Sequence, residues 1–374
     1  MFVLPAFMAG GAERQTADLA RGLVDYGHQC CVVSLRPRRE GTLSFEPLRF
    51  CDVNGYLDWS GISRLGGEIF HFAPHIVLAI GPYSLMYVHL ARWRCRLEPF
   101  RIAVALHATK TLSVKDWFQN LVYRRFAAAS DLLIYVCRFQ AEYCGRRGWR
   151  AARSTTIYNG IDLEYYRPPT ASQRAEARAQ LGVSDSELLI GITAVLRPEK
   201  NHAFLLNALR ELRAEGLPVK LLMVGDGPLR GTLERQAASL KLTPYAIFAG
   251  THADVRPLVA AFDVVTLASV SEALSMAALE AMSMGVPAVL SDVGGARELV
   301  LPGRNGFIFA PNDMSGFVDA IHQLTDAGVR ATFGAAARTH IQQNFTREAM
   351  LSAYLSQLGS LATAHVNHRQ LKST

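Results

Sequence analysis

Two glutamates stand eight positions apart in the segment SVSEALSMAALEAMSMGVPAVLSDVGGARELV, residues 269–300. We expect a helix to begin near Ser275, which places Glu272 in the loop before it and Glu280 inside it. The first turn of a helix offers unpaired backbone N–H groups and a partial positive charge, which suit a phosphate. We therefore predict that the N–H groups near Ser275 and Met276 bind a diphosphate. Glu272 would then accept hydrogen bonds from sugar hydroxyls, and Glu280 from a ribose.

A pair of cations follows an apolar segment earlier in this half of the chain. Arg197 and Lys200 come directly after the expected strand Leu188–Val195, and ligands of parallel sheets bind at the carboxyl ends of the strands. Two cations at that edge can neutralise a departing diphosphate. The alternative is that Glu199 simply pairs with one of them at the surface. We expect no metal ion, because the D-x-E sequence of residues 185–187 precedes its strand instead of following it.

The first half of the chain has two weaker candidate features. Gly10 and Gly11 stand between an apolar strand and a helix expected over Arg14–Val24, where two glycines let the backbone approach a ligand closely. A plain turn explains them equally well. His107 closes the expected strand Arg101–Leu106 and could accept or share the proton of an incoming hydroxyl. A single histidine is also often structural.

The segment Gly225–Gly231, GDGPLRG, imitates a dinucleotide-binding turn after a strand. Its glycine spacing is G-x-G-x-x-x-G, where the fingerprint requires G-x-G-x-x-G, and no acidic residue closes the next strand. The pattern argues against a dehydrogenase. We expect Gly225 to belong to a turn that lines a base pocket.

The elements that position these residues follow an α/β pattern. Short aliphatic runs alternate with helical segments, which is typical of parallel sheets covered by helices on both faces. A linker, RPPT at residues 167–170, divides the chain. We predict two Rossmann-like domains with parallel sheets facing a cleft, over residues 1–168 and 169–345, and a helical tail, 346–374, that packs back on the first domain. The expected strands are Phe2–Leu4, Cys30–Leu35, Ile76–Ile80, Arg101–Leu106, Leu132–Cys137, Thr155–Tyr158, Leu188–Val195, Val219–Val224, Ala246–Ala249, Val264–Leu267, Ala288–Ser291 and Phe307–Phe309.

Charge and cysteine content indicate partners and compartment. The net charge is +7, and residues 1–180 hold 23 Lys and Arg against 15 Asp and Glu, a bias that suits an anionic partner. The segment Lys115–Phe126 can form a basic amphipathic helix that lies on an anionic membrane, or it can pack on its own sheet. Nucleic acid is not expected as a partner. Six cysteines without a CxxC pair or a secretory leader indicate a cytoplasmic protein. The basic first half and the amphipathic segment would place it at the inner face of the membrane. The uncharged stretch between Glu68 and Arg92 contains Pro74 and Gly81-Pro82, so we predict a strand and a buried helix there and no membrane span.

Taken together, these motifs resemble family 4 of the retaining glycosyltransferases, the glycosyl transferases of group 1, which have the two-domain GT-B fold. Two features depart from that pattern: Ala273-Leu274-Ser275 stands where Gly-Phe-Pro is common, and Cys137 stands where Ser is frequent. The resemblance runs through nearly the whole chain in the expected order, over Gly10-Gly11-Ala12-Glu13, Tyr158-Asn159-Gly160-Ile161-Asp162, Arg197-Pro198-Glu199-Lys200-Asn201, Val224-Gly225-Asp226-Gly227-Pro228, Glu272-x7-Glu280, Gly285-Val286-Pro287, Asp292-Val293-Gly294-Gly295 and Glu298.

The resemblance implies transfer of a hexose from a UDP- or GDP-sugar with retention at the anomeric carbon, usually without a metal. It implies that Arg197 and Lys200 hold the diphosphate, that Glu272 contacts the sugar and that Glu280 contacts the ribose. Gly11 would leave room for the diphosphate, and His107 would stand where the family often has a cleft histidine.

From these features we expect a lipid-linked or glycan acceptor at the membrane, in the synthesis of a surface polysaccharide such as lipopolysaccharide. Two alternatives remain open, a nucleotide-sugar epimerase or hydrolase on the same fold and a non-catalytic nucleotide-sugar-binding subunit.

Overall fold

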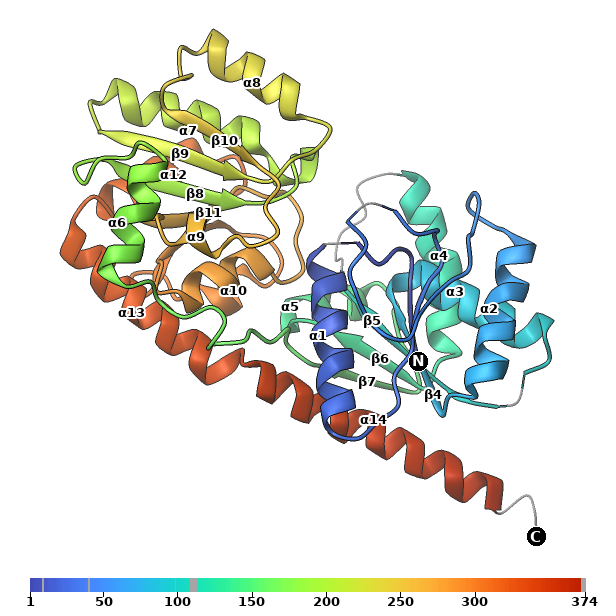
Figure 1. Ribbon diagram of the computed structural model, residues 1–374. Helices are drawn as coiled ribbons and strands as arrows, with labels where there is room; N and C mark the ends of the chain where they lie inside the picture. Colours follow the sequence, from blue (N-terminus) through green and yellow to red (C-terminus); the bar gives the residue numbers. More distant parts are fainter. Residues whose placement is uncertain (9, 40, 98, 108–113, 371–374) are drawn as a thin grey trace. The chain divides into compact units, whose positions relative to one another are not determined.

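The chain folds into two compact units (Figure 1). The computed structural model describes residues 1–8, 10–39, 41–97, 99–107 and 114–370. The first unit consists of residues 1–160 and 348–374, and the second of residues 161–347. Along the chain, the boundaries between the units therefore lie at 160/161 and 347/348, whereas the predicted boundaries are 168/169 and 345/346.

The first unit is built on a parallel sheet of seven strands in the order β3-β2-β1-β4-β5-β6-β7. One strand, β3, was not predicted, because Leu48–Phe50 is a short, half-exposed strand at the sheet edge with an arginine at its centre. The sheet consists of β1 (Phe2–Leu4), β2 (Val32–Ser34), β3 (Leu48–Phe50), β4 (Ile76–Ile80), β5 (Arg101–Leu106), β6 (Leu132–Tyr135) and β7 (Arg153–Thr156).

Helices cover both faces of this sheet, because neighbouring residues of each inner strand are apolar and point to opposite faces. Val77 and Ala79 of β4 pack with α2, α3 and α4, while Leu78 and Ile80 pack with α1 and α14. The strand and the buried helix predicted in the uncharged stretch are β4 and α3, which confirms that assignment. The helices of this unit are α1 (Gly11–Asp25), α2 (Trp59–Phe72), α3 (Gly81–Arg94), α4 (Val114–Ala128), α5 (Arg138–Arg146) and α14 (Arg347–Gln370).

The last helix, α14, belongs to the core of the first unit. Met350, Leu351 and Tyr354 are buried with the α1 side of the sheet. Helices α1 and α14 run so close together (Figure 1) that a Cβ atom on Gly22 would lie 2.4 Å from the Leu351 side chain. The first unit is thus made from two segments at opposite ends of the chain.

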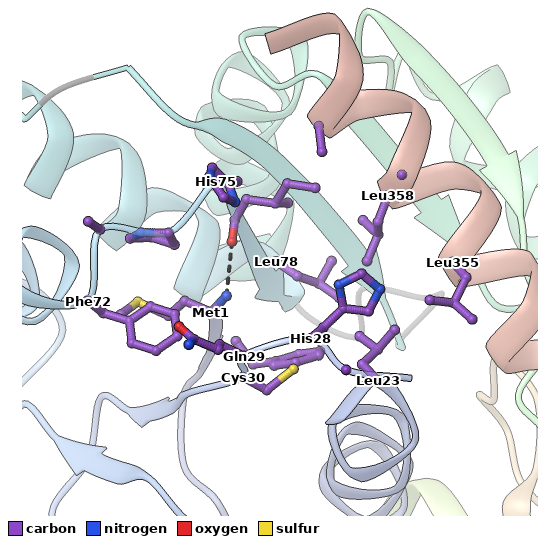
Figure 2. A pocket seen from close by; sticks show the side chains of 17 residues that line it. Met1, Leu23, His28, Gln29, Cys30, Phe72, His75, Leu78, Leu355 and Leu358 are labelled. Atoms are coloured by element: carbon purple, nitrogen blue, oxygen red, sulfur yellow. Dashed lines mark hydrogen bonds between the residues drawn. The ribbon is translucent and has the colours of Figure 1, made fainter. Parts of the chain in front are cut away.

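A cavity of about 450 Å³ lies at the amino end of β1, between β4 and α14 (Figure 2). Leu78, Leu355 and Leu358 line it together with His28 and His75, and the Met1 amino group donates a hydrogen bond of 3.0 Å to the Ile76 carbonyl beside it. This edge of the sheet is opposite to the carboxyl ends of the strands, where parallel sheets bind their ligands. The cavity is therefore separate from the candidate residues of this unit.

The second unit has a parallel sheet of six strands in the order β10-β9-β8-β11-β12-β13. All six strands were predicted, within one or two residues. They are β8 (Leu188–Thr193), β9 (Val219–Val224), β10 (Ala246–Gly250), β11 (Val264–Leu267), β12 (Ala288–Ser291) and β13 (Gly306–Phe309). The helices are α6 (Ala171–Gln180), the 3-10 helix η1 (Pro198–Lys200), α7 (His202–Ala214), α8 (Arg230–Ser239), α9 (Arg256–Val259), α10 (Met276–Ser283), α11 (Ala296–Leu299), α12 (Met314–Gln323) and α13 (Ala327–Asn344).

Candidate functional site

The two spaced glutamates lie at the carboxyl edge of the second sheet. Strand β11 ends at Leu267, and α10 begins directly after Ser275, which confirms the predicted helix start. Ser275 caps the helix, since its hydroxyl accepts a hydrogen bond of 3.2 Å from the Ala278 N–H and so satisfies one of the unpaired donors of the first turn. Glu272 lies in the loop before the helix and Glu280 inside it, as expected.

Lys200 and Glu272 are brought together although 72 residues separate them. The Lys200 ammonium donates to Glu272 Oε1, and the Ser269 hydroxyl donates to the same oxygen at 3.1 Å. The two loops are also joined through their backbones, because the Val270 N–H donates to the Glu199 carbonyl at 2.9 Å. A cation and a carboxylate therefore stand side by side, partly exposed, next to the start of α10.

Arg197 differs from Lys200. It is exposed at the start of η1, and its guanidinium makes no hydrogen bond or ion pair with any of the residues that the structure describes. Its backbone is fixed by hydrogen bonds from Arg197 N–H to Val195 and from Lys200 N–H to Arg197. In the part of the chain that the structure describes, Glu199 forms no ion pair with Arg197 or Lys200, and the carboxylate on Lys200 is that of Glu272.

The remaining predicted residues of this edge are more enclosed. Glu280 is only 2% exposed, and Ser275 is also buried, while Met276 is half-buried. Glu272 and Ser275 line a hollow of about 10 Å³ together with Ser291. Glu272 and the start of α10 thus border one small space, whereas Glu280 lies deeper in the helix.

Sequence reasoning missed the part that Gly294 plays. Its φ is +58°, in the left-handed region that favours glycine. A Cβ atom there would lie 2.4 Å from the Glu272 carbonyl and 2.6 Å from that of Ala273, and the Gly295 N–H donates to Ala273 at 2.6 Å. The Gly294–Gly295 pair therefore fixes the loop that carries Glu272. The signal in the sequence is the double glycine itself, at the end of the Asp292-Val293-Gly294-Gly295 motif.

Sequence reasoning also missed His202, the first residue of α7 and two positions after Lys200. Its side chain is buried, and neither ring nitrogen has a hydrogen-bond partner among the described residues. Burial, with the nearby charge of Lys200, lowers the pKa of His202 to about 4. The imidazole is therefore neutral at pH 7.

Gly225 forms a close contact inside the second unit. Its φ is +139°, and a Cβ atom would lie 2.1 Å from the Ala194 carbonyl. Its N–H donates to the Gly250 carbonyl at 2.8 Å. The glycine thus allows the turn after β9 to pack on the segment that leads to Arg197.

Gly10, Gly11 and His107 belong to the first unit. Gly10 precedes the first residue of α1, Gly11, and has no side chain to cap the helix. His107 follows β5 at the carboxyl edge of its sheet and is half-buried, and burial lowers its pKa to about 4. A neutral imidazole can accept a hydrogen bond from a hydroxyl but is a weak base at this pKa.

The predicted amphipathic segment forms part of α4, and its side chains are described from residue 119 onward. Leu121 and Val122 are exposed, while Tyr123 is buried.

Among the described residues, no three His, Cys, Asp or Glu side chains gather as a metal site would require. None of the helices, as far as the chain is described, is both long and apolar enough to cross a bilayer.

Comparison with known proteins identifies the family. The sequence profile of Glycosyltransferase Family 4 matches residues 9–165, and that of Glycosyl transferases group 1 matches residues 187–327. EpsF of Bacillus subtilis (strain 168), assigned as a glycosyltransferase, is 34% identical over 258 residues, which are 62% of this chain and 67% of EpsF. The chain belongs to the family 4 glycosyltransferases.

Another curated relative is also named a glycosyltransferase. The D-inositol 3-phosphate glycosyltransferase of Rhodococcus erythropolis is 29% identical over 73% of the chain and 68% of its own length. Across four such relatives, the aligned part makes up between 51% and 68% of the relative's length. The crystal structure of Anabaena HepE in complex with UDP-glucose has a TM-score of 0.82 at 23% identity, covering 96% of this chain and 99% of HepE. That likeness establishes the fold, and the predicted GT-B architecture is confirmed.

Proposed function

We propose that this glycosyltransferase moves a hexose from a UDP- or GDP-sugar to a lipid-linked or glycan acceptor, with retention at the anomeric carbon. The observation that carries the proposal is the pairing of Lys200 with Glu272 beside the capped start of α10. A cation and free helix N–H groups suit a diphosphate, and a carboxylate suits sugar hydroxyls. The HepE complex with UDP-glucose and the name of the Rhodococcus relative support a nucleotide-sugar donor and a transfer reaction.

In the mechanism that we favour, the acceptor oxygen bonds to the anomeric carbon as the bond from that carbon to the β-phosphate oxygen breaks. The acceptor proton passes to this departing phosphate oxygen, and no side chain becomes covalently attached. Lys200 and the exposed Arg197 would stabilise the charge that develops on the diphosphate. For this reason the proposal includes independence of a metal ion, and activity in excess EDTA should match that without it.

The proposal also places the acceptor at the inner face of the cytoplasmic membrane, in the synthesis of a surface polysaccharide or glycolipid. The first unit carries 22 Lys and Arg against 13 Asp and Glu, and the second carries 17 against 19. A basic first unit supports contact with anionic lipid or with a lipid pyrophosphate.

The test begins with a panel of UDP- and GDP-sugars in thermal unfolding, since a ligand that binds the folded protein raises its Tm. We expect one donor class to raise Tm, and Lys200→Ala and Glu272→Ala each to abolish transfer while the protein stays folded. Lys220→Ala and Glu187→Ala serve as matched controls. They remove another partly buried Lys–Glu pair of the same unit, with a separation of 3.1 Å, at the amino edge of the sheet. Near-normal turnover in both site variants would refute the proposed site.

The same material separates the alternatives. An epimerase or hydrolase would change or cleave the donor without an acceptor at the full rate of the enzyme. A non-catalytic subunit would show the donor-dependent rise in Tm and no turnover across an acceptor panel.

A further inference from the structure

Three exposed apolar side chains gather where the chain leaves the carboxyl end of β3. Tyr56, Leu57 and Trp59 are 46% to 49% exposed and lie within four consecutive residues. We call them the exposed trio. Tyr56 and Leu57 belong to the loop of residues 51–58, and Trp59 is the first residue of α2. Single exposed apolar residues are ordinary, but a run of large ones on one loop marks an interaction site.

The loop that carries the exposed trio is held in place from several sides. The Asp58 carboxylate accepts hydrogen bonds from the N–H groups of Asn54, Ser60 and Gly61 at 2.9–3.1 Å. The Tyr87 hydroxyl accepts from the Asp58 N–H at 2.9 Å and donates to the Tyr56 carbonyl at 3.3 Å. The exposed trio is therefore presented on a fixed backbone.

Tyr56 also joins the loop to α4. Its hydroxyl lies 2.6 Å from that of Tyr123, and the residues just before Tyr123 in α4, Leu121 and Val122, are exposed. The Tyr56 ring rests against Tyr83, with ring centroids 5.6 Å apart. The loop thus touches α4, the helix that the sequence marks as amphipathic, through Tyr123.

Cations border the exposed trio. The Arg94 guanidinium lies over the Trp59 ring at 5.7 Å and donates to the Ser63 hydroxyl at 3.1 Å. Arg64, partly exposed, pairs with Asp58 at 3.5 Å and so offsets that carboxylate. This surface belongs to the unit with the excess of 22 basic over 13 acidic residues.

We propose that Tyr56, Leu57 and Trp59 are the docking surface of this enzyme for an anionic phospholipid bilayer. The proposal deepens the proposed function, since a lipid-linked acceptor is reached at such a surface. Trp and Tyr favour the membrane–water interface, Leu57 between them favours hydrocarbon, and the bordering Arg94 favours anionic headgroups. A soluble saccharide is the less favoured partner, because an aliphatic side chain at the centre offers it neither a stacking face nor a hydrogen bond.

The test uses the full chain and vesicles of phosphatidylglycerol and phosphatidylcholine at equal amounts, compared with vesicles of phosphatidylcholine alone. We expect wild type to sediment with the anionic vesicles, and the double variant Leu57→Ser/Trp59→Ser to bind them at least about tenfold more weakly, since binding scales with the apolar area inserted. Phe70→Ser is the matched control. Phe70 lies near the other end of α2 and is 71% exposed, so this variant also loses a large exposed apolar side chain but should bind as wild type does.

A second arm tests the charge. Arg94→Gln should weaken binding to anionic vesicles and reduce its salt dependence, whereas Arg146→Gln, at an exposed position of α5, should change neither. The proposal is overturned if wild type does not bind anionic vesicles, if the double variant binds as well as wild type, or if Phe70→Ser loses as much binding. Protection of Trp fluorescence from a soluble quencher by an oligosaccharide, present in wild type and lost in the double variant, without vesicle binding would assign the surface to a saccharide instead.

The outcome can be told apart from failure of the proposed function. Donor binding, read as a rise in Tm with the UDP- or GDP-sugar, should be the same in wild type and in the double variant. Loss of vesicle binding with donor binding intact concerns only the docking surface. Absence of any donor effect in wild type concerns the proposed function.

Discussion

At the scale of single residues, Gly294 decides where Glu272 lies. Only a residue without a Cβ atom leaves room for the carbonyls of Glu272 and Ala273 at this point. The left-handed backbone adds a second reason for glycine. The position of the sugar-binding loop that we propose therefore depends on a residue that has no side chain to contact a ligand.

We predict that Gly294→Ala abolishes transfer and lowers the Tm, because the new methyl group displaces the Glu272 loop. Gly303→Ala is the control, since Gly303 is also left-handed, with φ +76°, but has no atom within 4 Å of a new Cβ. It should cost only the conformational strain, about 1–2 kcal/mol, with transfer unchanged per folded molecule. Both are measured by urea unfolding and by turnover. Equal turnover in the two variants would contradict the role given to Gly294.

Residue types and spacing could predict Lys200 and Glu272 as candidates, because charged residues at strand ends and helix starts are visible in a sequence. Their contact could not be predicted, since 72 residues separate them and it depends on how two loops meet. His202 could not be recognised either. A histidine after Lys200-Asn201 reads as a surface residue until the packing of α7 shows that it is buried.

At the scale of elements, the start of α10 is the feature on which the proposed donor site rests. Ser275 satisfies the Ala278 N–H, which leaves the earlier N–H groups of the first turn for a ligand. The helix also positions the buried Glu280 a little more than one turn from its start.

We predict that Ser275→Ala lowers the free energy of unfolding by about 1 kcal/mol and also weakens donor binding. Asp313→Ala removes the corresponding cap of α12, where the carboxylate accepts from the Gly316 N–H at 3.0 Å. It should lower stability by a similar amount and leave donor binding unchanged. The measurements are urea unfolding and the donor-induced change in Tm. A parallel loss of donor affinity in both variants would show that only general stability matters.

The inner strands of both sheets could be predicted because they are continuous aliphatic runs, as buried parallel strands require. The edge strand β3 could not, since an exposed Arg49 interrupts its three residues. Cys137 caps α5, because its sulfur accepts a hydrogen bond from the Gln140 N–H at the start of that helix. This role could not be predicted from the residue type.

At the scale of the whole molecule, partly and fully buried histidines link stability to pH. Burial lowers the pKa of His89, His107 and His202 to about 4, against an ordinary value of 6.5. The unfolded chain therefore binds more protons than the folded one between these values. The stability that these neutral histidines contribute is fully present above about pH 6.5 and is lost as the pH falls toward 4.

We predict that the free energy of unfolding decreases by up to about 1.4 kcal/mol per pH unit for each of these groups between pH 6.5 and 4. His202→Gln should remove one group's share of this slope. His252→Gln, at an exposed position, should leave the slope as it is. Urea unfolding at half-unit steps of pH measures all three proteins, and an unchanged slope in His202→Gln would contradict the assignment.

The two-segment construction of the first unit bears on how the chain is made. A ribosome translates residues 161–347 before α14, so the sequence of the second unit is finished while the first still lacks Met350, Leu351 and Tyr354. The unit that is begun first is thus completed last. During synthesis, the part of the apolar sheet face that α14 covers stays exposed until this helix emerges, and transiently exposed apolar surface makes a nascent chain prone to aggregation.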